Sequence, residues 1–171
     1  MSSFEIGEGF VGHGADAAHV NTMLGRRSGP VGTAFATALA TPSSGHVPFL
    51  CVYRPGVPCE PPTLFVNKAA VAGPRHAELT WGAAQVGVAE AVAECASVRF
   101  TPSDLAEWLL IVAVWVDPAA DDSDAIRRNN REATAIALAT GQAVVEGRAG
   151  AESISLWRSG EPAGNPYFEP R

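Results

Sequence analysis

The run Leu109–Val116 constrains the fold of this chain more than any other segment. It reads Leu-Leu-Ile-Val-Ala-Val-Trp-Val, without one polar side chain. A continuous apolar run of this length is typical of a strand that is covered on both faces. We therefore predict that it is a central strand of a sheet.

Further helices and strands are predicted around this strand. The expected strands cover residues 4–11, 47–53 and 63–71, and a short strand with a surface tail follows residue 141. The expected helices cover residues 30–39, 83–96, a segment that begins at Thr101, and 121–140 with Gly141 as its end. Strands and helices alternate without a Rossmann fingerprint or a phosphate loop, which favours an α+β two-layer sandwich. The length of 171 residues predicts a single domain over 1–171.

Composition and charge narrow the function classes. The net charge of −6 argues against non-specific electrostatic binding to nucleic acid. No apolar run reaches membrane-spanning length, and no basic stretch followed by an apolar run marks a secretory signal. The cysteines Cys51, Cys59 and Cys95 are odd in number and far apart, so we interpret them as reduced thiols of a cytoplasmic protein. The charged fraction of only 18% favours a homo-oligomer.

The glycine-rich segment Gly7–Asn21 holds the first candidate for chemistry. Its glycines permit tight turns and close approach to a ligand. His19 can transfer a proton near neutral pH, or it can bond a carbonyl in a turn. His13 is interpreted as a turn residue, and His46 and His76 as loop residues. Scattered histidines and separated cysteines predict no metal site.

Two further polar residues stand in apolar surroundings. Lys68 lies within the predicted strand 63–71, where a charge needs a partner, a cavity or a ligand. It can act as an amine nucleophile, or it can reach solvent at the strand end. Gln85 offers one acceptor and two donors to the edge of a heterocycle, or it caps a helix. There are two basic pairs, Arg26-Arg27 and Arg127-Arg128. They can bind the anionic tail of a cofactor, or they can lie on a solvated helix face.

Together these residues resemble the formaldehyde-activating enzyme family. No single motif is specific; the order and spacing of several segments carry the resemblance. They are Gly7 to His19, Thr33-Ala34-Phe35, Pro58-Cys59, Pro61 to Lys68, Gly82 to Ala91, Asn129 to Thr134, and the ending Asn165-Pro166-Tyr167-Phe168.

The resemblance implies a hydro-lyase of one-carbon metabolism and formaldehyde detoxification. It would condense formaldehyde with tetrahydromethanopterin, or a relative such as tetrahydrofolate, to the methylene derivative and water. The implied fold is like that of the second domain of ribosomal protein S5, and the implied assembly is a cytoplasmic homopentamer with clefts between subunits. His19 matches the catalytic proton donor, and the matches to the pterin site are Asn21, Leu50, Lys68, Ala70 and Gln85.

Two of these matches depart from the family pattern. Asn21 stands where the family has aspartate, and Ala70 where it has threonine. Asparagine keeps hydrogen bonding but loses the charge of the carboxylate. The departures bring the identity of the pterin into question. They also leave open a non-catalytic homologue that binds a pterin or formaldehyde as sensor or carrier, and an enzyme that uses another aldehyde or acceptor.

Overall fold

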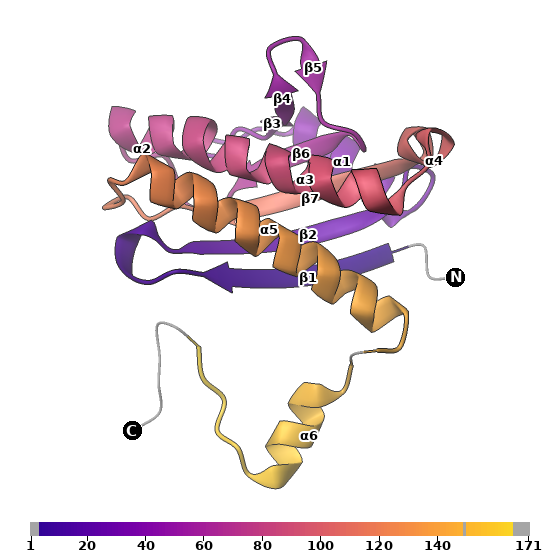
Figure 1. Cartoon of the computed structure of the whole chain (residues 1–171). Coiled ribbons are helices and arrows are strands. Elements are labelled where there is room, and N and C mark those ends of the chain that lie inside the picture. Colours follow the sequence, from indigo (N-terminus) through magenta and orange to yellow (C-terminus); the bar gives the residue numbers. More distant parts are fainter. Residues whose placement is uncertain (1–3, 149, 166–171) are drawn as a thin grey trace.

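The computed structural model describes residues 4–148 and 150–165 and contains a five-stranded sheet (Figure 1). The strands lie in the order β1 (Phe4–Val11), β2 (Ala18–Arg26), β7 (Trp108–Trp115), β6 (Thr63–Asn67) and β3 (Phe49–Leu50). Neighbours are antiparallel except β6 and β7, which are parallel. A separate hairpin joins β4 (Val52–Arg54) to β5 (Val57–Pro58). The predicted α+β class is confirmed.

The apolar run at residues 109–116 is the central strand β7, as predicted. Its side chains alternate between two cores. Leu110 and Val112 are buried in the larger core, while Leu109 and Ile111 belong to the smaller one. Burial on both faces explains why the run has no polar residue.

Two long helices, α3 (Gln85–Arg99) and α5 (Ser123–Val145), cover one face of the sheet (Figure 1). Helix α5 lies directly against β1 because β1 carries glycines where the two backbones meet. A Cβ placed on Gly7 would lie 1.7 Å from the carbonyl oxygen of Ala137, and one on Gly9 would lie 2.1 Å from that of Ala133. Only glycine permits this approach.

Among the residues that the structure describes, the opposite face of the sheet is covered at one end. Helix α1 (Pro30–Ala40) buries Val31 and Phe35 there against Leu64, Leu109 and Ile111. Beyond this contact, the side chains on the same face are half-buried or exposed, and we call this part the open face. By strand register it is formed by Glu8, Phe10, His19, Asn21, Val66, Ala113 and Trp115.

Short helical segments connect these elements. They are the 3-10 turn η1 (Gly14–Asp16), α2 (Pro74–Glu78), the π-helical segment η2 (Leu79–Ala84), α4 (Pro102–Glu107) and α6 (Glu152–Ser159). The predicted helix start at Thr101 is confirmed, because Thr101 and Asp104 form a reciprocal capping box. Among the described residues, no helix is both long and apolar enough to cross a membrane.

Several predicted boundaries are wrong. Gly141 does not end α5, because its small size serves packing: it is buried, and a Cβ there would lie 3.2 Å from the backbone of Ile6. The strand expected after residue 141 is instead helix α6. The strand 63–71 ends at Asn67, and 47–53 is split between β3 and β4. The helix at 83–96 is the end of a helical segment that begins at Pro74.

Candidate active site

The hairpin β1–β2 brings His19 next to a carboxylate on the open face. Cross-strand register pairs Phe10 with His19 and Glu8 with Asn21, so all four side chains point the same way. His19 Nε2 lies 3.1 Å from Glu8 Oε1, and their side chains are 35% and 56% exposed. The ring of Phe10 is tilted against the imidazole at 6.0 Å. The imidazole is thus held between an acid and an aromatic ring, and still reaches solvent.

Lys68 joins this group from the other side of β7. It follows the last residue of β6, and its backbone N–H donates to Val114 of β7 at 2.7 Å. Its Nζ donates to Asn21 Oδ1 at 2.8 Å. Because β7 lies between β6 and β2, the lysine side chain extends over the central strand. Lys68 is therefore at the strand end, but its ammonium group bonds to Asn21 instead of extending into solvent.

The charges of the group perturb one another. Burial lowers the pKa of His19, Lys68 lowers it further, and Glu8 opposes both. Burial also lowers the pKa of Lys68 to about 8, and Glu8 opposes this shift. Asn21 binds Lys68 without supplying a counter-charge. Lys68 therefore changes protonation closer to neutral pH than an exposed lysine would, whereas the shift of His19 favours the neutral imidazole.

The turn Ser43–His46 supports the backbone from which Lys68 projects. Asn67 Nδ2 donates to Gly45 O and to Ala69 O, each at 2.7 Å, and His46 Nδ1 lies 2.9 Å from Asn67 O. Ala70 lies beside this turn and is exposed; a Cβ on Gly45 would be 2.9 Å from that of Ala70. Asn67 thus fixes the segment that carries both predicted site residues.

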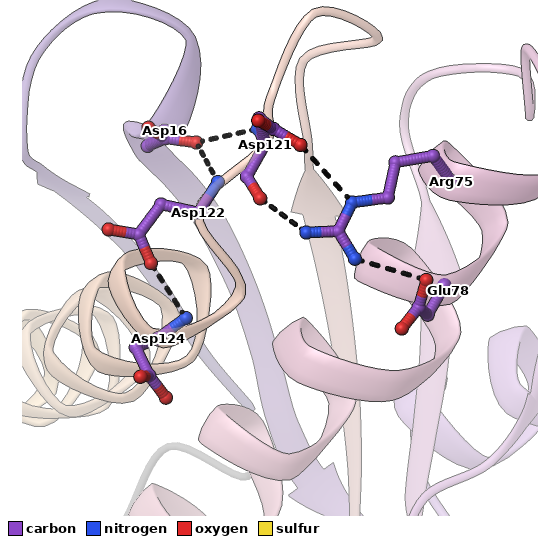
Figure 2. A network of polar contacts seen from close by, with 6 residues as sticks. All are labelled: Asp16, Arg75, Glu78, Asp121, Asp122 and Asp124. Carbon is purple, nitrogen blue, oxygen red and sulfur yellow. Dashed lines mark hydrogen bonds and ion pairs between the residues drawn. The ribbon is translucent and has the colours of Figure 1, made fainter.

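The hairpin loop that precedes His19 is fixed by a polar network (Figure 2). Asp16 Oδ1 accepts from the backbone N–H groups of Asp121 at 3.0 Å and Asp122 at 3.2 Å. Asp122 caps α5 by accepting from Asp124 N at 2.9 Å. Arg75 donates to the carbonyl of Asp121 and pairs with Glu78 at 3.0 Å (Figure 2). The loop is thereby tied to the starts of α5 and α2.

Two predicted pterin-site residues lie apart from this group. Gln85 belongs to the helical layer on the other face, is 7% exposed, and donates from Nε2 to Val52 O at 3.0 Å. It does not cap a helix, because the helical segment runs on through it. Leu50 pairs with Leu64 on the edge strand β3 and is 46% exposed. Within one chain, His19, Asn21 and Lys68 therefore lie together, whereas Gln85 and Leu50 lie elsewhere.

The other candidate residues have structural partners. His76 is not a loop residue: it is buried in α2, where Nδ1 accepts from Ala72 N at 3.0 Å and Nε2 faces Val116 O at 2.9 Å. Arg127 pairs with Glu90, and Arg131 with Glu94, which favours the helix-face interpretation of this basic cluster. Among the residues that the structure describes, no three His, Cys, Asp or Glu side chains are grouped to hold a metal ion.

The sequence interpretation did not identify Glu8 as a site residue. Its position opposite Asn21 and one pair from His19 follows from the hairpin register. The alternation of Glu8 with Gly7 and Gly9 was a signal for it, because glycines on one face of a strand leave the residue between them on the other.

Comparison with known proteins connects this chain to one family. Residues 6–147 match the family model described as formaldehyde-activating enzyme (Fae). The chain is 42% identical over 136 residues to the bifunctional enzyme Fae/Hps of Methanosphaera stadtmanae, a match that covers 79% of this chain and 34% of that protein. The enzyme of the same name from Methanosarcina mazei is 43% identical over 136 residues, with 79% and 35% covered. The match thus spans about a third of the length of these relatives.

Proposed function

This chain belongs to the formaldehyde-activating enzyme family, and from that membership we propose that it condenses formaldehyde with a tetrahydropterin to the methylene derivative and water. The observation that carries the proposal is the pairing of His19 with Glu8 beside Lys68 on the open face. A proton donor, a carboxylate paired with it and a cation stand together on a partly exposed surface.

In the proposed reaction, an amine nitrogen of the pterin attacks the carbonyl carbon, and a carbinolamine forms. His19 protonates the hydroxyl oxygen, the C–O bond breaks and water leaves. The second pterin nitrogen then bonds to the same carbon and gives up its proton, which restores the protonated His19. Glu8 holds the imidazole in place and favours its protonated form.

Asn21, Lys68 and Ala70 bear on which pterin is used. Asn21 and Lys68 are joined by a hydrogen bond and offer donors and an acceptor to a pterin edge. We propose tetrahydromethanopterin or a relative such as tetrahydrofolate. Loss of one hydrogen bond to the pterin costs about 1 kcal/mol, or roughly fivefold in affinity. The uncharged Asn21 also favours the second candidate, a carrier or sensor that binds the ligand without turnover.

The proposal includes assembly and location. Leu50 and Gln85 lie away from His19 in one chain, so we propose a homopentamer in which a neighbouring copy supplies them at the cleft. Three free thiols suit a reducing compartment, and we propose that the reaction serves one-carbon metabolism and formaldehyde detoxification in the cytoplasm.

The experiment is methylene-pterin formation from formaldehyde, followed with tetrahydromethanopterin and tetrahydrofolate in parallel. We expect His19→Ala to lower the catalysed rate by about 100-fold or more, because a general acid contributes that much. His13→Ala is the matched control, since His13 is exposed beside η1. Tight pterin binding without turnover would instead support the carrier or sensor, and an unchanged rate in His19→Ala would remove His19 from the mechanism.

A further inference from the structure

Cys51 and Cys59 stand opposite each other at the base of the β4–β5 hairpin. The pairing of Val52 with Pro58 continues by one residue on each side to Cys51 and Cys59. The backbone N–H of Cys59 donates to the carbonyl of Cys51 at 3.0 Å, which confirms that the two residues face each other. Both thiols are free and buried.

This geometry suits a disulfide. Residues opposed across an antiparallel ladder have Cα atoms about 4.5–5.5 Å apart, within the range of bridged cysteines, and their side chains share one face. The interaction between the two thiols lowers the pKa of Cys59 and, with burial, raises that of Cys51. The two cysteines are therefore unequal: Cys59 is the better nucleophile.

Cys59 also has a path to solvent. It lines an open cavity of about 420 Å³ together with Tyr53, Pro58, Glu60 and Ala93. Cys59 is 4% exposed and Cys51 0%. A small oxidant in this cavity therefore contacts Cys59 and not Cys51, which does not line the cavity.

We propose that Cys51 and Cys59 are a redox pair that a peroxide converts to a reversible disulfide. The sulfur of Cys59 attacks one peroxide oxygen, the O–O bond breaks, and a sulfenic acid and the first water form. The sulfur of Cys51 then attacks the sulfenic sulfur, the S–O bond breaks and the second water leaves. Two thiols lose two hydrogens and two electrons, and the peroxide takes up both. A cross-strand bridge of this kind is readily reduced again by a dithiol.

The bridge would change the surroundings of Gln85. In the reduced protein the Cys51 thiol donates to Gln85 O at 3.7 Å, while Gln85 Nε2 donates to Val52 O. Oxidation removes the first of these donors and joins the two sides of the hairpin covalently. An effect of this change on pterin affinity would depend on the proposed function. Formation of the bridge itself does not depend on it.

The test is a peptide map of the full-length protein after hydrogen peroxide and a thiol-blocking reagent. Trypsin does not cut between Arg54 and Pro55, so the peptide 28–68 carries both cysteines, while Cys95 lies in the peptide 76–99. We expect the first peptide to lose two hydrogens and escape blocking, and to regain two free thiols after a dithiol reductant. We expect Cys95 to remain a free thiol at the same dose.

Two variants sharpen the result. Cys51→Ser should leave a sulfenic acid on Cys59 that a cyclic diketone traps, and Cys95→Ser should behave as the unsubstituted protein. The proposal is overturned if both thiols of peptide 28–68 are blocked at a dose that oxidises Cys95, or if the bridge joins Cys95. It is also overturned if Cys59 oxidises past the sulfenic stage equally with and without Cys51. The map of the unsubstituted protein decides alone if a variant does not fold, and a failed pterin assay leaves this result untouched.

Discussion

At the scale of single residues, the site depends on a balance between Glu8 and Lys68 around His19. Lys68 and burial favour the neutral imidazole, and Glu8 favours its protonated form. Proton donation by His19 at neutral pH therefore relies on the carboxylate.

Glu8→Gln tests this balance. Removal of the negative charge takes away the larger of the two influences that raise the pKa of His19, so that pKa falls further. We expect the acid-requiring limb of the rate–pH profile to move to lower pH, with a loss of about tenfold at pH 7. Glu132→Gln, an exposed acid on α5, is the control. An unshifted profile in Glu8→Gln would show that Glu8 does not tune the imidazole.

Lys68→Met tests whether the lysine is kept at a cost to stability. The folded pKa of about 8 lies below the ordinary 10.5, so the folded state disfavours the ammonium. The stability cost of the buried ammonium is complete below pH 8. Between pH 8 and pH 10.5 it shrinks, because Lys68 loses its proton in the folded state before it does so in the unfolded state, and above pH 10.5 it is gone. After allowance for solvent screening, we expect the unfolding free energy of the variant to exceed that of the unsubstituted protein by roughly 1 kcal/mol at pH 7. At pH 10.5 we expect the two proteins to be equally stable. Denaturant titrations at both pH values measure this; a constant difference would contradict it.

The local sequence pattern singled out His19 and Lys68, because each is a polar residue in unusual surroundings, whereas Asn21 was singled out by the resemblance to the family. It did not single out Glu8, because the proximity of Glu8 to His19 depends on how two strands align. It also could not separate Gln85 from His19, since which face of a sheet a helix covers is decided by packing of the whole chain.

At the scale of elements, the hairpin that carries Glu8 and His19 is positioned by contact between β1 and α5. Gly9→Ala would place a methyl group 2.1 Å from the carbonyl oxygen of Ala133, so strand and helix must separate. We expect a loss of about 2–3 kcal/mol in unfolding free energy. Gly82→Ala, with no atom within 4 Å of the new Cβ, should be neutral or stabilising by up to about 1 kcal/mol. Equal effects of the two substitutions would refute the close-approach argument.

The elements that were predicted correctly have strong local signals, and the missed ones do not. The uninterrupted apolar run predicted β7, and the capping threonine before a proline predicted the start of α4. Strand β2 escaped prediction because its inward side includes the small Ala18 and the polar Thr22, and because the glycine-rich segment before it favours a turn. Gly141 was interpreted as a helix end, whereas packing against β1 requires it inside the helix.

At the scale of the whole molecule, α6 stands apart from the sheet and its helices (Figure 1). Every described residue from Glu146 onward is exposed, including Trp157 at 78%. Truncation after Gly147 should therefore leave the thermal midpoint of an isolated chain within about 2 °C, because little apolar surface is re-exposed. Calorimetry at low and high protein concentration measures this. A midpoint that falls only at high concentration would show that α6 contacts another copy.

The parallel pairing of β6 with β7 has a consequence for the order in which the site forms. Glu8 and His19 come together through a hairpin, a local event that closes a short loop. Lys68 and Asn21 are 47 residues apart in the chain, and the strand that separates them in the sheet is contributed by later residues, 108–115. Contacts of such long sequence separation form late in folding. The Lys68–Asn21 bond thus reports completion of the sheet: a half-folded chain can hold its acid and imidazole together, but it acquires the lysine only when the central strand has been inserted.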